Sequence, residues 1–330
     1  MPESKKRLAL ITGANGFVGR ALCAGILLQG WQIAGGVRCQ RQLPAGVRTV
    51  VVGSINGETD WLDALDGVNE VIHLAARVPV MNDTAVDPLA EFRKVNVDGT
   101  LNLARQAAKA GVKRFIFFSS IGVLGSETLL SPFSELSEPN PHSDYAVSKL
   151  EAEEGLKKIC AETGMEFVII RPPLIYGASA PGNFARLLRL VNLSLPLPLG
   201  AINNQRSMVS LENLVDFVNL CIIHPKAANQ IFLVADGTDV STPKLIRLLG
   251  EGMGKSVRLA PVPVKLLELV ASVIGKQNMV QPLCGSLQID ITKARNVLNW
   301  TPPVPVDEGL RRAAQRFKCD RAGSQRRPNG

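Results

Sequence analysis

The sequence of 330 residues predicts a doubly wound α/β fold, in which helices cover both faces of a parallel sheet, with a smaller lobe toward the C-terminus. Two observations predict it. Over the first two thirds of the chain, short apolar segments rich in β-branched residues alternate with segments of helix length. From Pro172 onward, prolines and glycines break this alternation, which returns only between Glu212 and Val234.

The predicted strands are almost continuously apolar, as strands covered on both faces must be. They are Leu8–Thr12, Gln32–Val37, Thr49–Val52, Glu70–Leu74, Arg114–Phe118, Phe167–Ile170 and Ile231–Val234. The segments between them predict helices at Phe17–Gln29, Asp60–Leu65, Pro88–Ala110, Ser143–Thr163 and Glu212–Ile223. Parallel strands joined through helices need right-handed crossovers, and these give a doubly wound sheet.

Breaks in the alternation predict how the chain is divided. We expect the sheet domain in residues 7–171 and 210–235, and the smaller lobe in residues 172–209 and 236–320. The chain is 46% hydrophobic and 20% charged, so it can bury a large core without a metal or a disulfide framework. The same composition excludes disorder for most of the chain.

The formal net charge of +8 is concentrated at the end of the sequence. Residues 311–330 hold seven arginines or lysines against one aspartate. We therefore expect a basic, flexible tail over residues 321–330 that is solvated, with no nucleic-acid partner.

Other features predict a cytoplasmic protein without a metal site. The six cysteines are scattered, with no CxxC pair, which is typical of reduced thiols. The apolar run Leu8–Ile11 is too short for a secretory signal. The segment from Val262 to Gly275 carries Lys265 and Glu268, and we expect it to be a buried amphipathic helix, with no insertion into a membrane.

A glycine-rich loop follows the first predicted strand and opens the first predicted helix. Its sequence is Gly13-Ala14-Asn15-Gly16-Phe17-Val18-Gly19. Glycines at this place permit a tight turn and a close approach of the backbone to a pyrophosphate, and the helix N-terminus favours the anion. This context predicts a dinucleotide-binding Rossmann domain.

The end of the second strand indicates which dinucleotide is bound. An acidic residue there commonly meets the adenosine ribose of NAD, but no acid occurs between Gly30 and Pro44. Arg38 and Arg41 lie there instead. A guanidinium matches a 2′-phosphate, so Arg38 favours NADP over NAD, the alternative being a solvated surface arginine.

A tyrosine and a lysine lie four residues apart on one predicted helix face, at Tyr145 and Lys149. A phenol with its ordinary pKa near 10 is a poor base, and a nearby ammonium lowers that pKa. Ser119 and Ser120 follow the Arg114–Phe118 strand at the carboxyl edge of the sheet. A hydroxyl there can hydrogen-bond a substrate oxygen that alternates between alcohol and ketone.

These residues resemble a known family in an ordered set of motifs. The motifs are the loop Gly13 to Gly19, His73-Leu-Ala-Ala76, Val95-Asn96-Val-Asp-Gly-Thr-Leu-Asn102, Phe118-Ser-Ser120, Tyr145-x-x-x-Lys149, Arg171-Pro-Pro-x-x-Tyr-Gly177 and Ile289 to Trp300. The chain resembles the extended short-chain dehydrogenases/reductases of the NAD-dependent epimerase/dehydratase family over residues 8 to 315. The resemblance implies an NAD(P)-dependent enzyme that acts on nucleotide sugars.

The resemblance also implies a role for each matching residue. Tyr145 would be the acid/base, Lys149 its partner and Ser120 the catalytic hydroxyl, while Asn96 would orient a relay water. Ser120, Asn183 and Arg206 would contact the substrate, and Leu197 to Gly200 would flank its base. The cofactor would contact Gly13, Asn15, Gly16, Phe17, Val18, Gly19, Arg38, Leu74, Ala75, Ala76, Tyr145, Lys149 and Pro172.

Three departures from the family pattern affect the predicted site. Ser54 replaces an aspartate that commonly meets the adenine, and Leu124 replaces the tyrosine of Val-Tyr-Gly. No arginine occurs in Val280–Gly285, where a second phosphate-binding arginine is common.

The implied reaction is hydride transfer at C4 of a nucleotide sugar. A 4,6-dehydratase needs a further acid/base pair directly after the catalytic hydroxyl, and Ile121 and Gly122 cannot transfer protons, so dehydration is excluded. Two reactions remain, that of a UDP-hexose 4-epimerase and that of a 4-ketoreductase of a 4-keto-6-deoxy sugar. Arg38 slightly favours the reductase, because it favours NADPH. The alternatives are an NADPH-dependent reductase of a non-nucleotide ketone or alcohol, similar to dihydroflavonol reductases and hydroxysteroid dehydrogenases, and a non-catalytic dinucleotide binder. Family members pair two helices, here Pro88–Ala110 and Ser143–Thr163, so we expect a homodimer.

Overall fold

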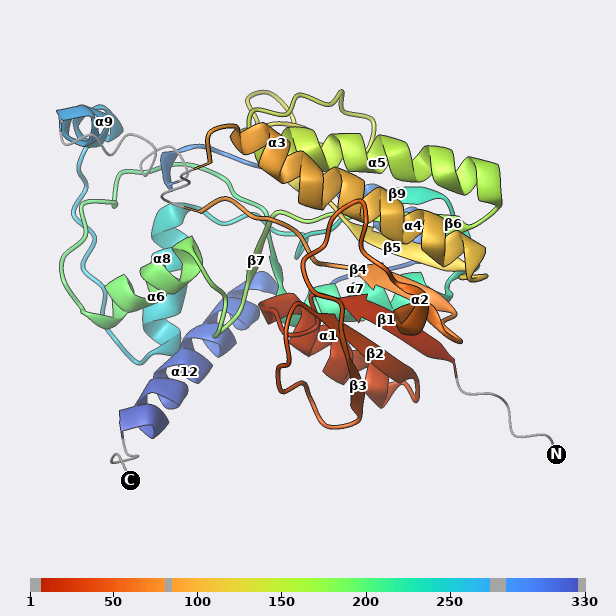
Figure 1. Ribbon diagram of the computed structural model, residues 1–330. Helices are drawn as coiled ribbons and strands as arrows, with labels where there is room; N and C mark the ends of the chain where they lie inside the picture. Colours follow the sequence, from red (N-terminus) through yellow and green to blue (C-terminus); the bar gives the residue numbers. More distant parts are fainter. Residues whose placement is uncertain (1–6, 81–84, 274–282, 326–330) are drawn as a thin grey trace.

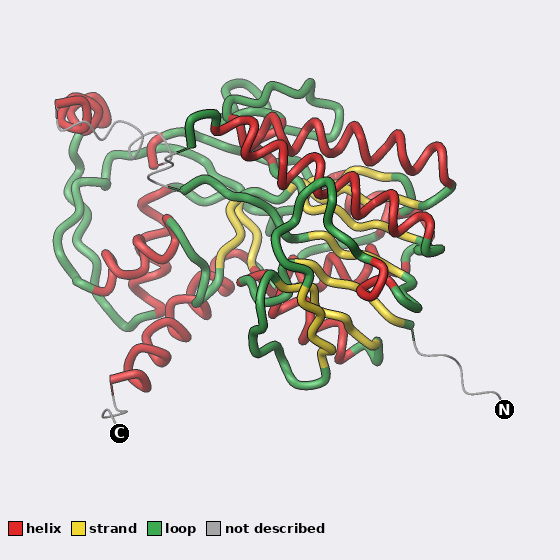
Figure 2. Tube along the Cα trace, in the orientation of Figure 1, coloured by secondary structure: helices red, strands yellow, loops and turns green. Residues whose placement is uncertain are grey.

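A single parallel sheet of seven strands forms the centre of the molecule (Figures 1 and 2). The computed structural model describes residues 7–80, 85–273 and 283–325. The strand order is β3-β2-β1-β4-β5-β6-β9, the doubly wound order that the sequence predicts. The strands are β1 (Leu8–Thr12), β2 (Gln32–Val37), β3 (Val47–Val51), β4 (Glu70–His73), β5 (Arg114–Phe118), β6 (Glu166–Arg171) and β9 (Gln230–Leu233).

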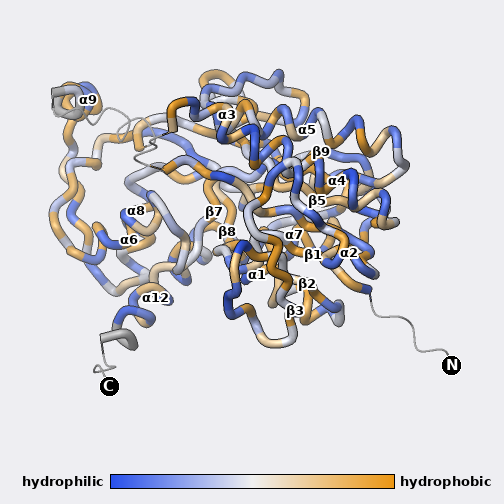
Figure 3. The backbone as a smooth tube through the Cα atoms, in the orientation of Figure 1, coloured by the Kyte–Doolittle hydropathy of each residue, from blue (hydrophilic) through white to orange (hydrophobic). Residues whose placement is uncertain are grey.

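Helices cover both faces of this sheet, and alternate residues of each strand face opposite layers. In β5, Ile116 packs in the layer of α1 (Phe17–Leu28) and α7 (Leu211–Ile223). Phe115 and Phe117 pack in the opposite layer, with α4 (Thr100–Lys109) and α5 (Asp144–Thr163). Figure 3 shows hydrophobic residues concentrated along the strands. The helices are α1 (Phe17–Leu28), α2 (Leu62–Leu65), α3 (Pro88–Arg93), α4 (Thr100–Lys109), α5 (Asp144–Thr163) and α7 (Leu211–Ile223).

The segment Pro88–Ala110, expected as one helix, contains a π-helical turn. Asp87 begins the helical stretch by accepting a hydrogen bond from the Ala90 amide (3.0 Å). The π turn, Lys94–Gly99, lies between α3 and α4. Turns of this kind often mark functional sites, and this one contains Asn96. No periodicity of apolar residues distinguishes a π turn from an α-helix, so the sequence did not predict it.

The smaller lobe has structure that the sequence analysis left as loops. β7 (Leu174–Tyr176) pairs in parallel with β8 (Met208–Ser210). Both strands are only three residues long, too short to show an alternating pattern. The lobe core contains Tyr176 and packs α8 against α12. The remaining elements are α6 (Asn183–Asn192), α8 (Thr242–Gly252), α9 (Val264–Val273), α11 (Thr292–Leu298), α12 (Val306–Gln325), and 3₁₀ turns at Ile121–Val123 and Pro225–Ala227.

Two expectations about the C-terminal part can be compared with the structure. We expected a buried helix in the segment from Val262 to Gly275. The segment contains the helix α9, but the expected burial is wrong. α9 stands away from the body (Figure 1), which leaves Leu266 and Leu269 49% and 61% exposed. α12 continues to Gln325, so the first residues of the expected tail are helical, and residues 326–330 lie outside the described part. Within the described residues, no helix is long and apolar enough to cross a membrane.

The division of the chain into two domains stays a prediction. The separate core of the lobe fits it, since Tyr176, Leu188 and Leu249 pack together away from the sheet. However, Ile289 and Trp300, which we assigned to the lobe, pack into the core beneath the sheet.

Candidate active site

The glycine-rich loop has the geometry of a phosphate cradle. Gly13 has a φ of +66°, and a side chain there would press against the Ala75 amide at 3.1 Å. A Cβ at Gly19 would lie 2.2 Å from the Gly13 carbonyl oxygen, so only glycine lets α1 pack this closely. The open loop leaves the first amides of α1 available to an anion, and these residues therefore fit the pyrophosphate of a nicotinamide dinucleotide.

Thr12, which the sequence analysis did not single out, fixes the turn after β4. Its Oγ1 atom accepts hydrogen bonds from the Leu74 and Ala75 amides, both at 3.1 Å. Because these two bonds use the acceptor sites of the hydroxyl, Thr12 donates its own proton to Nδ1 of His73 (2.7 Å). Nε2 of His73 then carries the ring proton and donates to Thr100 Oγ1 (3.0 Å). Burial, and to a lesser extent Lys149, lowers the pKa of His73 to about 3, so the ring is neutral and structural.

A cavity of about 590 Å³ runs from this loop along the carboxyl ends of β2 and β3. Ser54 and Asn56 line it on the β3 side, and Arg38 and Arg41 line it at the end of β2. Of the predicted cofactor residues it holds Gly13, Asn15, Arg38, Ala75 and Ala76. Gly16 and Phe17, together with Asn15, border a second cavity of about 680 Å³ toward α12.

The helix α5 carries the predicted acid/base pair. Ser143 caps it by accepting from the Ala146 amide (3.2 Å). The ammonium of Lys149 donates to the Phe118 carbonyl (2.8 Å) and lies 4.5 Å from the centre of the Phe117 ring. Lys149 is 2% exposed. Burial lowers its pKa to about 7, and burial raises the pKa of Tyr145 to about 12.

Asn96, on the π turn, connects α5 to the loop after β4. Its side chain donates to Ser148 Oγ (3.0 Å), and Ser148 in turn donates to the Tyr145 carbonyl (2.8 Å). The same amide group exchanges two hydrogen bonds with the backbone of Arg77 (2.8 and 3.1 Å). The ring of Phe92 packs edge-on against Tyr145, with 6.0 Å between centres. Asn96 is therefore buried beside the predicted acid/base, where it orients the backbone.

Ser120 lies on the loop that follows β5 and caps a short 3₁₀ turn. Its Oγ accepts from the Gly122 amide (3.1 Å). The Ile121 amide donates to the Pro172 carbonyl (3.0 Å), which ties this loop to the end of β6. A Cβ at Gly122 would lie 3.6 Å from the Cβ of Ala146, so the loop packs on the first turn of α5. The structure thus brings Ser120 beside the helix of Tyr145.

The predicted substrate residues lie in the smaller lobe. Asn183 is exposed at the start of α6, after Gly182 with a φ of +71°. Arg206 precedes β8; its guanidinium donates to the Gly285 carbonyl (3.0 Å), and burial lowers its pKa. The Leu197 and Gly200 backbones pair with the segment around Ala260. Of Val280–Gly285, where we noted the missing arginine, the first three residues lie outside the described part.

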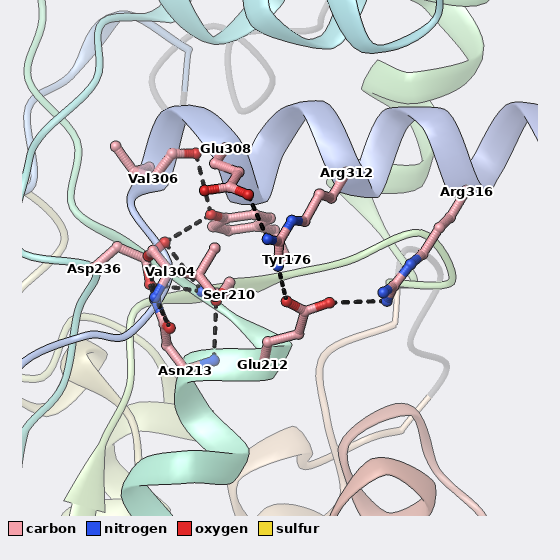
Figure 4. A network of polar contacts seen from close by, with 10 residues as sticks. All are labelled: Tyr176, Ser210, Glu212, Asn213, Asp236, Val304, Val306, Glu308, Arg312 and Arg316. Carbon is pink, nitrogen blue, oxygen red and sulfur yellow. Dashed lines mark hydrogen bonds and ion pairs between the residues drawn. The ribbon is translucent and has the colours of Figure 1, made fainter.

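Tyr176, from the Arg171-to-Gly177 motif, belongs to a network of hydrogen bonds that joins β7 to α7 and to the segment before α12 (Figure 4). Its hydroxyl donates to Asp236 (2.7 Å), which also accepts from the side chain of Asn213 (2.7 Å). Asn213 exchanges two more hydrogen bonds with the backbone of Val304, at 2.8 and 2.9 Å. Burial raises the pKa of both Tyr176 and Asp236, so this tyrosine serves packing and not proton transfer.

The sequence analysis missed three buried residues around this site: Thr12, Phe92 and Glu153. Thr12 precedes the glycine loop, and a hydroxyl directly before that loop is the signal that could have identified it. Glu153 follows Lys149 by four residues, the same spacing as Tyr145 to Lys149. In the described residues, no group of three or more histidines, cysteines, aspartates or glutamates could hold a metal ion.

A Rossmann sheet with a glycine-rich loop and a Tyr-x-x-x-Lys helix defines the class of extended short-chain dehydrogenases/reductases. Within that class, the chain belongs to the NAD dependent epimerase/dehydratase family, whose model matches residues 9–235.

Similarity to individual proteins extends over almost the whole chain. It is 44% identical over 320 residues to a UDP-glucose 4-epimerase of Vibrio cholerae, covering 96% of each chain. It is 27% identical to the N-acetyl-alpha-D-glucosaminyl-diphospho-ditrans,octacis-undecaprenol 4-epimerase of Escherichia coli O157:H7, covering 93% of this chain and 94% of that protein. The crystal structure of a UDP-glucose 4-epimerase of Thermotoga maritima superposes with a TM-score of 0.76 at 24% identity, covering 95% of this chain and 99% of that one.

Proposed function

We propose that this protein is a nucleotide-sugar 4-epimerase that inverts C4 of a UDP-hexose. The observation that carries the proposal is the Tyr145–Lys149 pair on one face of α5. Lys149 is buried and bonded to the Phe118 carbonyl at the end of β5, and the loop of Ser120 packs on the first turn of the same helix. Both relatives described above are named as 4-epimerases of a hexose attached to a diphosphate, which supports epimerisation over net reduction.

A nicotinamide cofactor, when bound, would supply reversible hydride transfer at C4 of the sugar, which inverts that carbon when the two transfers use opposite faces. Gly13, Gly16 and the first amides of α1 would hold its pyrophosphate. Tyr145 removes the proton of the 4-hydroxyl as C4 is oxidised and gives it back on reduction. The positive charge of Lys149 favours the phenolate form of Tyr145. Ser120 donates a hydrogen bond to the developing ketone oxygen.

Dehydration is outside this proposal. Loss of water from C5 and C6 needs a second acid/base pair near the sugar. The two residues after Ser120 are Ile121 and Gly122, and neither side chain can transfer a proton. The 4-keto sugar therefore has one further reaction open to it, the return of the hydride.

We infer that NADP is preferred over NAD. The cavity along β2 and β3 has Arg38 and Arg41 at the place where a 2′-phosphate would lie, and Ser54 stands where an aspartate commonly contacts the adenine. Asn183 and Arg206 would hold the substrate diphosphate, with Leu197 to Gly200 beside the base.

We also propose a cytoplasmic homodimer. The helices α3, α4 and α5 form one outer layer of the sheet domain (Figure 1). Two such layers would pack as a four-helix interface around a two-fold axis.

The experiment that tests the proposed function is a product assay with a panel of UDP-hexoses and no added cofactor or reductant. We expect UDP-galactose and UDP-glucose, or their N-acetyl forms, to interconvert. Consumption of NADPH with a 4-keto sugar and no interconversion would favour a reductase. A 4-keto-6-deoxy product would contradict the proposal.

A further inference from the structure

A third ionisable side chain, Glu153, lies in line with the proposed acid/base pair. Tyr145, Lys149 and Glu153 follow one another at four-residue spacing and so share one face of α5. Glu153 is fully buried, and the mechanism above does not use it. A buried carboxylate is costly unless it is paired and hydrogen-bonded, so its place behind Lys149 needs an explanation.

Arg171, the last residue of β6, holds Glu153 in a two-point ion pair. Its Nε donates to one carboxylate oxygen at 2.9 Å and its Nη2 to the other at 2.6 Å. Arg171 is 3% exposed. Two parallel bonds of this kind fix the orientation of the carboxylate.

We propose that Glu153 is a positioning residue that keeps charge on the Lys149 ammonium and thereby makes the Tyr145 hydroxyl easier to ionise. Arg171 holds the carboxylate in place through its two hydrogen bonds. This inference rests on the proposed function of Tyr145 and Lys149 and adds the source of their electrostatic tuning.

The Phe118 carbonyl and the Phe117 ring favour the charge of Lys149 as neutral groups, and Glu153 is the titratable group among the described residues that favours it. Burial lowers the pKa of Lys149, and Glu153 acts against it. Burial, and to a lesser extent Lys149, lowers the pKa of His73 of β4, and its neutral ring supplies no negative charge. Tyr145 of the same helix is protonated at neutral pH, because burial raises its pKa to about 12. Arg171 of β6 is positive and engaged by Glu153.

The composition of the chain makes a direct test possible. The protein contains only two tyrosines, Tyr145 and Tyr176. Tyr176 is buried and donates to Asp236, which raises its pKa out of the accessible range. The near-ultraviolet absorbance of tyrosinate in the enzyme loaded with NADP⁺, the cofactor inferred above, therefore reports on Tyr145, and Tyr145→Phe provides the blank.

The titration is recorded between about pH 6 and pH 10 for wild type and three variants. Glu153→Gln removes the negative charge. Glu153→Gln combined with Arg171→Gln removes both members of the ion pair, so that Arg171 is not left without its partner, and is used if the single variant does not fold. The matched control is Glu166→Gln, which breaks a similar ion pair, with Arg114 (2.7 Å), at the other end of β6.

We expect the Tyr145 midpoint to rise by roughly one pH unit in both Glu153 variants and to stay unchanged in the control. A wild-type midpoint in both Glu153 variants, or a titration step that persists in Tyr145→Phe, would overturn the proposal. The titration needs no sugar. An unshifted midpoint in an active epimerase therefore contradicts this inference alone, and a shifted midpoint without epimerisation contradicts only the proposed function.

Discussion

The ammonium of Lys149 lies 6.0 Å from the centre of the Tyr145 ring, one turn along the same face of α5. Burial acts on both groups in the same sense: it lowers the pKa of Lys149 to about 7 and raises that of Tyr145 to about 12. Burial therefore disfavours the charged form of each group. The pKa of Tyr145 can fall toward the working pH only when Lys149 keeps its positive charge and the oxidised cofactor adds a second one.

Removal of the phenolic hydroxyl is expected to stop turnover without affecting the fold. Tyr145→Phe keeps the ring that packs against Phe92 and loses only the proton-transfer group. We expect kcat to fall by roughly 10²- to 10⁴-fold, while the dissociation constant of the cofactor changes little. A coupled assay and a fluorescence titration measure the two quantities. A variant that kept most of its activity would remove Tyr145 from the mechanism.

Arg38→Ala tests the cofactor preference. The substitution removes a guanidinium from the cavity along β2 and should weaken NADPH binding by about tenfold or more, with little change for NADH. The matched control is Arg48→Ala, because Arg48 is an exposed arginine on the neighbouring β3. Equal losses for both dinucleotides, or a wild-type protein that binds NADH more tightly, would contradict the assignment.

Glu70 makes the stability of the fold depend on pH, and it has no role in the proposed reaction. Burial raises its pKa from 4.5 to about 7, and one of its oxygens has no hydrogen-bond partner among the described residues. The folded state therefore holds a proton that the unfolded state releases near pH 4.5. This contribution to stability is complete below about pH 4.5 and is lost as the pH rises through about 7.

Glu70→Gln should consequently be more stable than wild type at about pH 8, by roughly 1–3 kcal/mol, and similar to it at about pH 4.5. Thermal or urea unfolding at the two pH values measures the difference. Glu58→Gln, at an exposed glutamate, is the control and should behave like wild type at both. A difference at Glu70 that did not depend on pH would refute this explanation.

The oligomeric state is a separate prediction. If α3, α4 and α5 pair with those of a second copy, light scattering at micromolar concentration should give twice the mass of one chain. Arg105→Glu, on an exposed position of α4, should then weaken the association, whereas Glu58→Gln should not. A monomeric wild-type protein would exclude the four-helix interface.

The sequence predicted those features whose physical cause is local. Each strand of the large sheet is a short apolar run, and the Gly13–Gly19 loop needs glycine for reasons that hold in any chain of this topology. The β7–β8 pair depends on an encounter between Leu174 and Met208, far apart in the sequence, and has no local signature.

The same distinction applies to the candidate site. Tyr145 and Lys149 share a helix, so their spacing alone brings them together. The ion pair of Glu153 and Arg171 joins α5 to the end of β6, and only the folded sheet brings these residues into contact. The exposure of Leu266 and Leu269 depends on how far α9 stands from the body, which an amphipathic pattern does not encode.

The central claim, that a hydride leaves C4 and returns to it, is tested most directly by isotope transfer. UDP-galactose carrying deuterium at C4 is incubated with the enzyme in ordinary water, without added cofactor, and the product is examined by NMR and mass spectrometry. We predict UDP-glucose that retains the deuterium at C4, with no incorporation of solvent hydrogen there and no such product from Tyr145→Phe. Loss of the label to solvent, or a 4-keto-6-deoxy sugar as the product, would contradict the account.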